Sequence, residues 1–84
     1  MAKTGYKKKR DQAMLDVVGK NIRYYRQQKE IKQVKFANMC NIEPKMLYSY
    51  EYGKVEIGVS MVALIAKQLG LEPNVLLIPR EELK

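Results

Sequence analysis

The chain has 84 residues, 30% of them charged and 46% hydrophobic, which allows one soluble domain with a small core and excludes the large barrel and dinucleotide-binding enzyme folds. It contains no histidine and one cysteine, so histidine-based acid–base chemistry, histidine metal sites, an internal disulfide and multi-cysteine zinc sites are excluded. The net charge is +7, and residues 1–45 hold 12 basic against 4 acidic residues, an asymmetry that favours a polyanionic partner on one face.

Residues 1–10 (MAKTGYKKKR) form the first segment, with five basic residues, no acidic residue and almost no apolar side chain. This composition is typical of a flexible basic arm. Two interpretations of the arm remain open, a solvated tail or a segment that contacts DNA.

The first predicted helix runs over about residues 11–29. Its apolar stripe recurs at helical spacing and consists of Met14, Val18, Ile22 and Tyr25. Residues 30–32 then predict a short turn. A second helix follows over about residues 33–40, and its expected buried residues are Phe36, Ala37 and Cys40.

The third predicted helix spans about residues 44–52 and follows a turn at Asn41. Asn tolerates the left-handed backbone conformation that closes a helix, and Pro44 suits the first position of the next helix because no N–H is needed there. Glu43 is then the N-cap. Leu47 and Tyr50 are expected to face inward, and Gly53 is expected to end the helix.

A fourth helix is predicted over about residues 59–69, with an apolar face of Val59, Val62, Ile65, Ala66 and Leu69. Gly70 ends it, Pro73 opens a short fifth helix through about Leu77, and Pro79 closes the fold. No segment alternates with period two, so no strand is expected. The prediction is an all-α domain over residues 11–79, between the basic arm and a C-terminal tail at residues 80–84.

Two short helices joined by a turn of three or four residues, as expected over residues 33–52, form a helix-turn-helix, whose second helix can enter the major groove of DNA. The turn needs a small residue where the helices cross, and Ala37 supplies it. It also needs a residue that tolerates left-handed geometry, which Asn41 supplies. The expected apolar anchors are Phe36, Ile42, Leu47 and Tyr50.

An ordered set of short segments extends this pattern without a gap over about residues 18–77: Gly19-Lys20-Asn21-Ile22-Arg23, Arg26, Ile31, Gln33, Phe36-Ala37, Ile42, Leu47, Glu51-Tyr52-Gly53-Lys54 and Ala66-Lys67-Gln68-Leu69-Gly70-Leu71. In these residues the sequence resembles the phage-repressor and Cro-like helix-turn-helix family (XRE type). The resemblance implies a compact five-helix, lambda-repressor-like domain that acts as a DNA-binding transcriptional regulator.

By this resemblance, Gln33 contacts a phosphate and supports the recognition helix, whereas Arg26 and Glu51 form a largely buried ion pair between the first and third helices. The expected role of the pair is mainly architectural. Because desolvation offsets the attraction between the charges, the pair is not expected to stabilise the fold strongly, although losing one partner would cost roughly 3–5 kcal/mol.

The resemblance also implies that the outward positions of the third helix face base edges and flanking phosphates; these are Glu43, Pro44, Lys45, Tyr48, Ser49 and Tyr52. Lys45 can donate to guanine O6 or N7, Glu43 can accept from cytosine N4, and Pro44 offers only an apolar contact, such as one to a thymine methyl. Tyr48 replaces the small hydroxyl residue usual there. This is a thin set of base contacts, so modest discrimination per half-site is expected.

Basic residues near the helix-turn-helix are candidates for phosphate contacts, with a solvated surface role as the alternative for each: Lys20, Arg23, Lys29, Lys32 and Lys35. Tyr52 and Lys54 also lie where phosphate contacts are expected. Two positions depart from the family pattern. Glu30 replaces a usual Gly or Asn, and Lys32 replaces the usual Ser or Thr cap, which costs about 1 kcal/mol but adds a positive charge.

The apolar stretch over residues 71–78 has two possible roles. It either pairs two copies in a homodimer, which would place the two recognition helices about 34 Å apart, or covers the core of a single copy.

The predicted function is that of a sequence-selective regulator of double-stranded DNA, a repressor of the Cro/C1 type that places helix 44–52 in the major groove, without enzymatic activity or cofactor. The alternative is a protein-interaction module on the same fold, such as an antitoxin-like protein whose partner is a toxin or another regulator. Glu43, Pro44 and Tyr48 favour the alternative slightly, and the basic first half opposes it.

No apolar run approaches the ~20 residues of a membrane span, and no apolar segment of the signal-peptide type follows the basic arm. The sequence therefore predicts a cytoplasmic protein that has no membrane partner, and the family resemblance implies a bacterial or phage origin. In a reducing compartment, Cys40 is expected to be a core residue rather than a reactive thiol.

Overall fold

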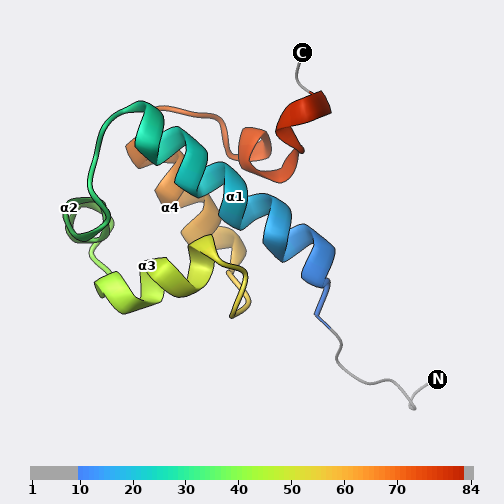
Figure 1. Cartoon of the computed structure of the whole chain (residues 1–84), viewed down its shortest axis with the longest axis horizontal. Coiled ribbons are helices and arrows are strands. Elements are labelled where there is room, and N and C mark those ends of the chain that lie inside the picture. Colours follow the sequence, from blue (N-terminus) through green and yellow to red (C-terminus); the bar gives the residue numbers. More distant parts are fainter. Residues whose placement is uncertain (1–9, 83–84) are drawn as a thin grey trace.

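The structure is a computed structural model that describes residues 10–82. Residues 1–9 of the predicted arm lie outside the described residues. Residues 10–82 form four α-helices followed by two short 3₁₀ segments: α1 (Gln12–Gln28), α2 (Gln33–Met39), α3 (Pro44–Glu51), α4 (Val59–Leu69), η1 (Pro73–Leu77) and η2 (Arg80–Glu82) (Figure 1). Residues 10–82 contain no strand, and none of their helices is long and apolar enough to span a membrane.

The expected fifth helix is a 3₁₀ segment, so the prediction of five helices is corrected to four. In η1 the Val75 amide donates to the Glu72 carbonyl, a three-residue step, and the segment ends at Ile78 in an extended conformation. The buried side chain of Asn21, on α1, donates to the Leu76 and Ile78 carbonyls at 2.9 Å each. These carbonyls are thus held by α1 instead of by later amides of a continuing α-helix.

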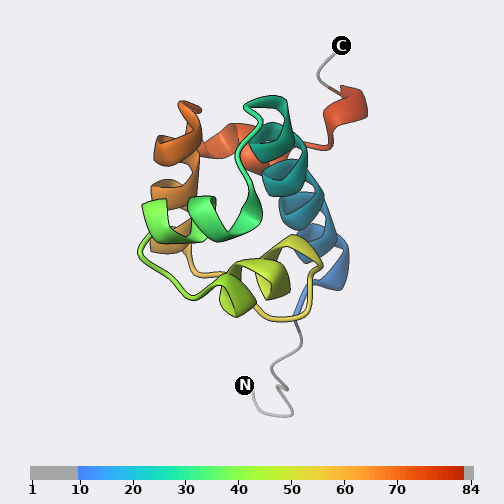
Figure 2. The same cartoon turned by 60° about the vertical axis from the view of Figure 1, so that its left-hand side comes forward.

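The core lies where α1 packs against α3, α4 and η1, with α2 closing one side (Figure 2). Each fully buried Leu, Ile or Phe side chain contributes roughly 1.5–3 kcal/mol through removal of its apolar surface from water. The large apolar side chains with at most 1% exposure are Ile22, Phe36, Leu47, Ile65, Leu69 and Leu76. Apolar residues from every helix therefore meet in one core.

Two side chains predicted on buried faces lie at the surface. Val59 is 86% exposed, because it is the first residue of α4 and lies one turn before the first buried residue of that helix, Val62. Met14 is 39% exposed, because the buried face of α1 passes through Leu15 and Gly19. The hydrophobic pattern correctly placed Val18 and Ile22 on this face but could not include Gly19 and Asn21, which are not apolar side chains.

Residues in left-handed backbone conformation follow the helices. Asn41 has φ +60° and Gly53 has φ +66°, in agreement with their predicted roles as helix-ending residues. Glu30, where the family pattern has Gly or Asn, also adopts φ +58°, a conformation that costs a residue with a Cβ roughly 1–2 kcal/mol. Lys32 precedes α2 without a side-chain capping bond.

Two arginines at the predicted domain boundaries contact the helical domain. Arg10, placed in the arm by sequence, donates through Nη1 to the Lys54 carbonyl at 3.1 Å. Arg80, placed in the tail, lies with its guanidinium carbon 3.4 Å from the centre of the Tyr24 ring. Both contacts lie at the surface, because Arg10 and Arg80 are exposed, and the domain boundaries at residues 11 and 79 stay predictions.

Candidate DNA-binding surface

A tight turn at residues 40–43 joins α2 and α3. The Cys40 amide donates to the Phe36 and Ala37 carbonyls at 3.0 and 3.1 Å, and the Ile42 amide returns to the Ala37 carbonyl at 3.0 Å. The left-handed Asn41 makes this return possible, and the fully buried Ala37 lets the two helices approach. The geometry is that of a helix-turn-helix (Figure 2).

The helix α3 presents one face to the core and the other to solvent. Leu47 and Glu51 are buried, and Tyr50 packs against the core from its edge. The predicted outward residues are all at least partly exposed: Glu43, Pro44, Lys45, Tyr48, Ser49 and Tyr52. Met46, which the sequence analysis did not single out, is 41% exposed on the same helix.

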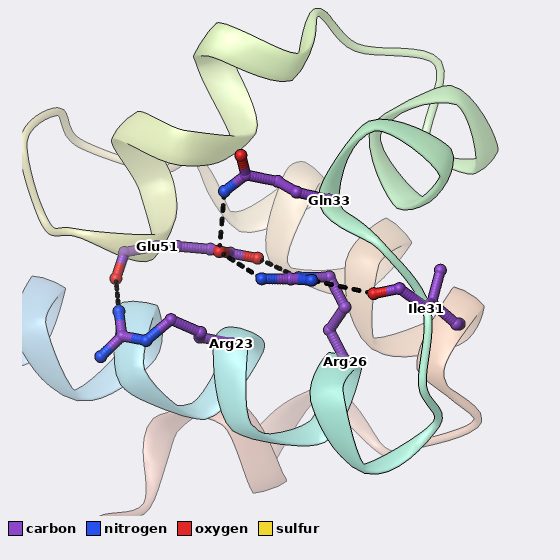
Figure 3. Close-up of polar contacts among 5 residues, drawn as sticks. All are labelled: Arg23, Arg26, Ile31, Gln33 and Glu51. Atoms are coloured by element: carbon purple, nitrogen blue, oxygen red, sulfur yellow. Dashed lines mark hydrogen bonds and ion pairs between the residues drawn. The ribbon is translucent and has the colours of Figure 1, made fainter.

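A buried carboxylate sets the position of α3. Arg26 donates to Glu51 through Nε at 2.6 Å and through Nη2 at 3.0 Å, and Gln33 Nε2 donates to the same carboxylate at 3.0 Å (Figure 3). The remaining Arg26 bond, from Nη1, goes to the Ile31 carbonyl at 2.8 Å. Glu51 thus connects α1, the first residue of α2 and the last residue of α3.

The Gln33 side chain is therefore directed at Glu51 from the start of α2, and its contact with a phosphate stays a prediction. Among the described residues, every buried side-chain nitrogen or oxygen has a hydrogen-bond partner. A network without unpaired buried groups keeps its members in one arrangement. Its consequence here is a recognition helix with a defined orientation relative to α1 and α2.

The end of α3 is held a second time by Arg23 on α1. Arg23 Nη1 donates to the Glu51 carbonyl at 2.8 Å (Figure 3), and its guanidinium carbon lies 4.5 Å from the centre of the Tyr52 ring. The Tyr52 ring in turn lies 4.7 Å from that of Tyr48. Sequence reasoning placed Arg23 at phosphates and missed this stack, because the pairing joins residues 29 positions apart.

A close approach of backbones also went unpredicted. A Cβ atom at Gly19 would lie 2.5 Å from each of the Tyr50 and Glu51 carbonyl oxygens. Only glycine allows α1 to come so near to the end of α3. The available signal was a glycine in the middle of a helical pattern. Such a glycine costs the helix about 1 kcal/mol relative to alanine, so it usually has a packing reason.

Exposed cations surround the helix-turn-helix, as predicted from the sequence. Lys32 precedes α2, Lys45 is on α3 and Lys54 follows α3, and all three are exposed. Lys20, Lys29 and Lys35 are also exposed. On the loop after α3, Gln12 Nε2 donates to the Gly53 carbonyl at 2.7 Å, so α1 supports the loop that carries Lys54.

Residues 10–82 contain no cluster of three or more His, Cys, Asp or Glu side chains able to hold a metal ion. Burial raises the pKa of the Cys40 thiol to about 11, and a neutral buried thiol is a poor nucleophile.

Solved structures of similar shape support this description of the fold. The hypothetical transcription factor NHTF from Neisseria has a TM-score of 0.79 and 24% identity, over 92% of this chain and 90% of its own. The restriction-modification controller protein C.AhdI from Aeromonas hydrophila has a TM-score of 0.72 and 23% identity, over 76% of this chain and 97% of its own.

A third structure is that of an enzyme, hydroxypropylphosphonic acid epoxidase from S. wedmorenis, with a TM-score of 0.76 and 18% identity. The match covers 82% of this chain but only 37% of the epoxidase, so it shows a shared helical fold and carries no activity to this chain.

Comparison at the level of families is more specific. No curated protein matches the chain significantly. Residues 22–76 match the family model described as helix-turn-helix, which covers more than half of the chain and the whole of α2, the turn and α3. The chain therefore belongs to the helix-turn-helix family of the XRE type.

Proposed function

We propose that the protein is a sequence-selective transcriptional regulator of double-stranded DNA, which places α3 in the major groove and represses by occupying its operator. The observation that carries this proposal is the buried network of Arg26, Gln33 and Glu51, which holds α3 at the surface with its outer side chains free. An α-helix with its side chains is about 10–12 Å in diameter and can enter a major groove about 12 Å wide.

The side chains divide into base contacts and phosphate contacts. Lys45 is proposed to donate to guanine, and Glu43 to accept from cytosine. The Ser49 hydroxyl can pair with a donor or an acceptor on a base edge, and Pro44 gives an apolar contact. The proposed phosphate contacts are Arg23, Lys32, Gln33, Tyr52 and Lys54. The exposure of the three lysines and the high positive charge of residues 1–45 support this division.

A homodimer is the second part of the proposal. Leu77 is 42% exposed, and three neighbours of the buried Leu76 remain partly exposed: Leu71, Val75 and Ile78. An apolar surface of this kind can pair two copies, which would place two α3 helices about 34 Å apart on successive turns of DNA.

The test is selection from a random duplex pool by the purified protein, followed by fluorescence anisotropy on the enriched site at 50 and 200 mM salt. A two-fold symmetric site is expected from a dimer. Affinity should fall steeply with salt, about 10³-fold or more if six or more phosphates are neutralised. Enrichment of a single, asymmetric half-site would contradict the homodimer, and absence of salt-dependent binding would contradict the DNA function.

The role of Lys45 is tested on the same site. Lys45→Ala should weaken specific binding by about 1–3 kcal/mol and leave binding to a scrambled duplex nearly unchanged. The matched control is Lys67→Ala, which removes an exposed lysine from α4. An equal loss on both duplexes would show that Lys45 contacts a phosphate.

A protein-interaction module remains a second candidate, because one feature favours it. A hollow of about 510 Å³ opens between α2 and α3, and its lining includes Asn38, Ile42, Pro44, Met46 and Tyr50. Such a hollow can accept an apolar side chain of a partner. This function predicts no DNA binding at low salt, together with capture of a protein partner that Met46→Glu abolishes.

A further inference from the structure

The outer face of α3 carries two parallel rows of side chains with different chemistry. Residues four apart lie above one another on a helix, so Pro44, Tyr48 and Tyr52 form one row and Lys45 and Ser49 form the other. The second row is polar. The first row is apolar and aromatic, and Tyr48 and Tyr52 remain 44% and 49% exposed.

The aromatic row is held in place from α1. The Tyr48 and Tyr52 rings lie 4.7 Å apart with their planes 37° from parallel, and the Arg23 guanidinium carbon lies 4.5 Å from the Tyr52 ring centre. Arg23 is itself fixed by its hydrogen bond to the Glu51 carbonyl. Rings restrained in this way lose little further rotational freedom when they bind a ligand.

We propose that this aromatic row, Tyr48 with Tyr52 behind it and Arg23 as the positioning residue, recognises the C5-methyl group of a pyrimidine in the major groove, as carried by thymine or 5-methylcytosine. The inference rests on the proposed function and adds the chemical group that is recognised. Base edges in the major groove otherwise offer hydrogen-bond donors and acceptors, which an aromatic ring face does not satisfy, whereas the C5-methyl is apolar.

Two other uses of the tyrosines fit the geometry less well. Stacking on single-stranded bases needs a free platform, but the Tyr52 ring already has Arg23 and Tyr48 against it. If the Tyr48 and Tyr52 hydroxyls both contacted phosphates, the exposed ring surfaces would lie in the groove without an apolar partner.

Burying one methyl-sized group is worth about fourfold in affinity, which sets the size of the expected effect.

The experiment uses two random duplex pools selected in parallel, one made with thymidine and one with deoxyuridine, which lacks only the C5-methyl group. Dissociation constants are then measured on the site enriched from the thymidine pool, with single thymine-to-uracil and cytosine-to-5-methylcytosine replacements. If thymine is the ligand, uracil at one or two positions should weaken binding about fourfold each. If 5-methylcytosine is the ligand, methylation of one cytosine should strengthen binding by a similar factor.

Variants assign the effect to the row. Tyr48→Ala should remove the preference for the methylated base, and Tyr48→Phe, which retains the ring, should restore it. Arg23→Lys keeps the charge but removes the planar stacking group, so it should reduce the preference while leaving the salt dependence unchanged. Lys67→Ala, which removes an exposed lysine from α4, is the matched control and should keep both the affinity and the preference. Thermal melting by circular dichroism checks that each variant folds.

The outcomes separate the two proposals. Enrichment of a site whose affinity is indifferent to every C5-methyl group would overturn this inference and leave the DNA-binding function standing. An Arg23→Lys variant that retains the full preference for the methylated base would show that Arg23 does not position the aromatic row. No enrichment from the thymidine pool would overturn the proposed function and this inference with it.

Discussion

Gly19 determines how closely α1 approaches the end of α3. The atoms that a Cβ at this position would meet are backbone carbonyl oxygens of Tyr50 and Glu51, which cannot move aside as a flexible side chain can. The same two residues also carry the contacts of the recognition helix to the core and to Arg26. The absence of a Cβ at Gly19 therefore lets α1 and α3 approach closely enough for Arg26 and Glu51 to form their ion pair.

Gly19→Ala is expected to destabilise the protein by up to about 2 kcal/mol, because overpacking against backbone, which costs about 1–3 kcal/mol, outweighs the roughly 1 kcal/mol that alanine adds to a helix. The measurement is urea denaturation followed by circular dichroism. Ala13→Gly, at an exposed position of the same helix, is the control and should lose about 1 kcal/mol from helix propensity alone. A more stable Gly19→Ala variant would show that the helices can separate without loss.

At the scale of elements, α1 organises the molecule by holding two segments that are distant in sequence. Toward α3 it offers Arg23 and Arg26, and toward the C-terminal segment it offers Asn21. The Asn21 amide group has two hydrogens, and its two shortest bonds, to the Leu76 and Ile78 carbonyls, use both. This buried polar contact specifies the position of η1 relative to α1.

Asn21→Ala should cost about 1–3 kcal/mol, because two carbonyls lose their donor in a part-buried site. Native-state hydrogen exchange should show faster exchange of the amides in η1, whereas amides in α3 keep their protection. Asn74→Ala, an exposed asparagine within η1, should change stability by no more than about 0.5 kcal/mol. Equal acceleration of exchange in α3 would mean that Asn21 supports the whole fold rather than this segment.

At the scale of the whole molecule, the core encloses a titratable group. Cys40 follows α2 in the turn and is 1% exposed, and removal from water raises the pKa of its thiol to about 11 from its ordinary value of 9.0. The folded state therefore favours the neutral thiol more than the unfolded state does. The resulting contribution to stability is complete below pH 9 and disappears as the pH rises toward 11.

The free energy of unfolding should therefore fall more steeply between pH 9 and 11 in the native sequence than in Cys40→Ala. Comparison of the two proteins isolates the thiol, because every other side chain is common to both. Urea titrations at pH 7, 9 and 11 provide the values. Parallel pH profiles for the two proteins would show that the thiol remains in contact with water.

Local sequence features determined the helix-turn-helix and its boundaries. Asn41, Pro44 and Gly53 act through their own backbone preferences, so the turn and both ends of α3 were predicted within one residue. Gly53 also belongs to the ordered set of residues, with Arg26 and Glu51, that carried the resemblance to the XRE-type family, which the family comparison confirms. Such signals are legible in sequence because each depends on residues a few positions apart.

The tertiary structure alone decided where the buried faces of α1 and α4 begin and how α3 is held. Met14 and Val59 follow the helical spacing yet lie at the surface, whereas Gly19 and Asn21 interrupt it and are buried. The stack of Arg23 on Tyr52, the bond from Gln33 to Glu51 and the 3₁₀ form of η1 likewise depend on partners 18 to 57 residues away. Periodicity carries no information on such contacts, because they arise only when separate helices meet.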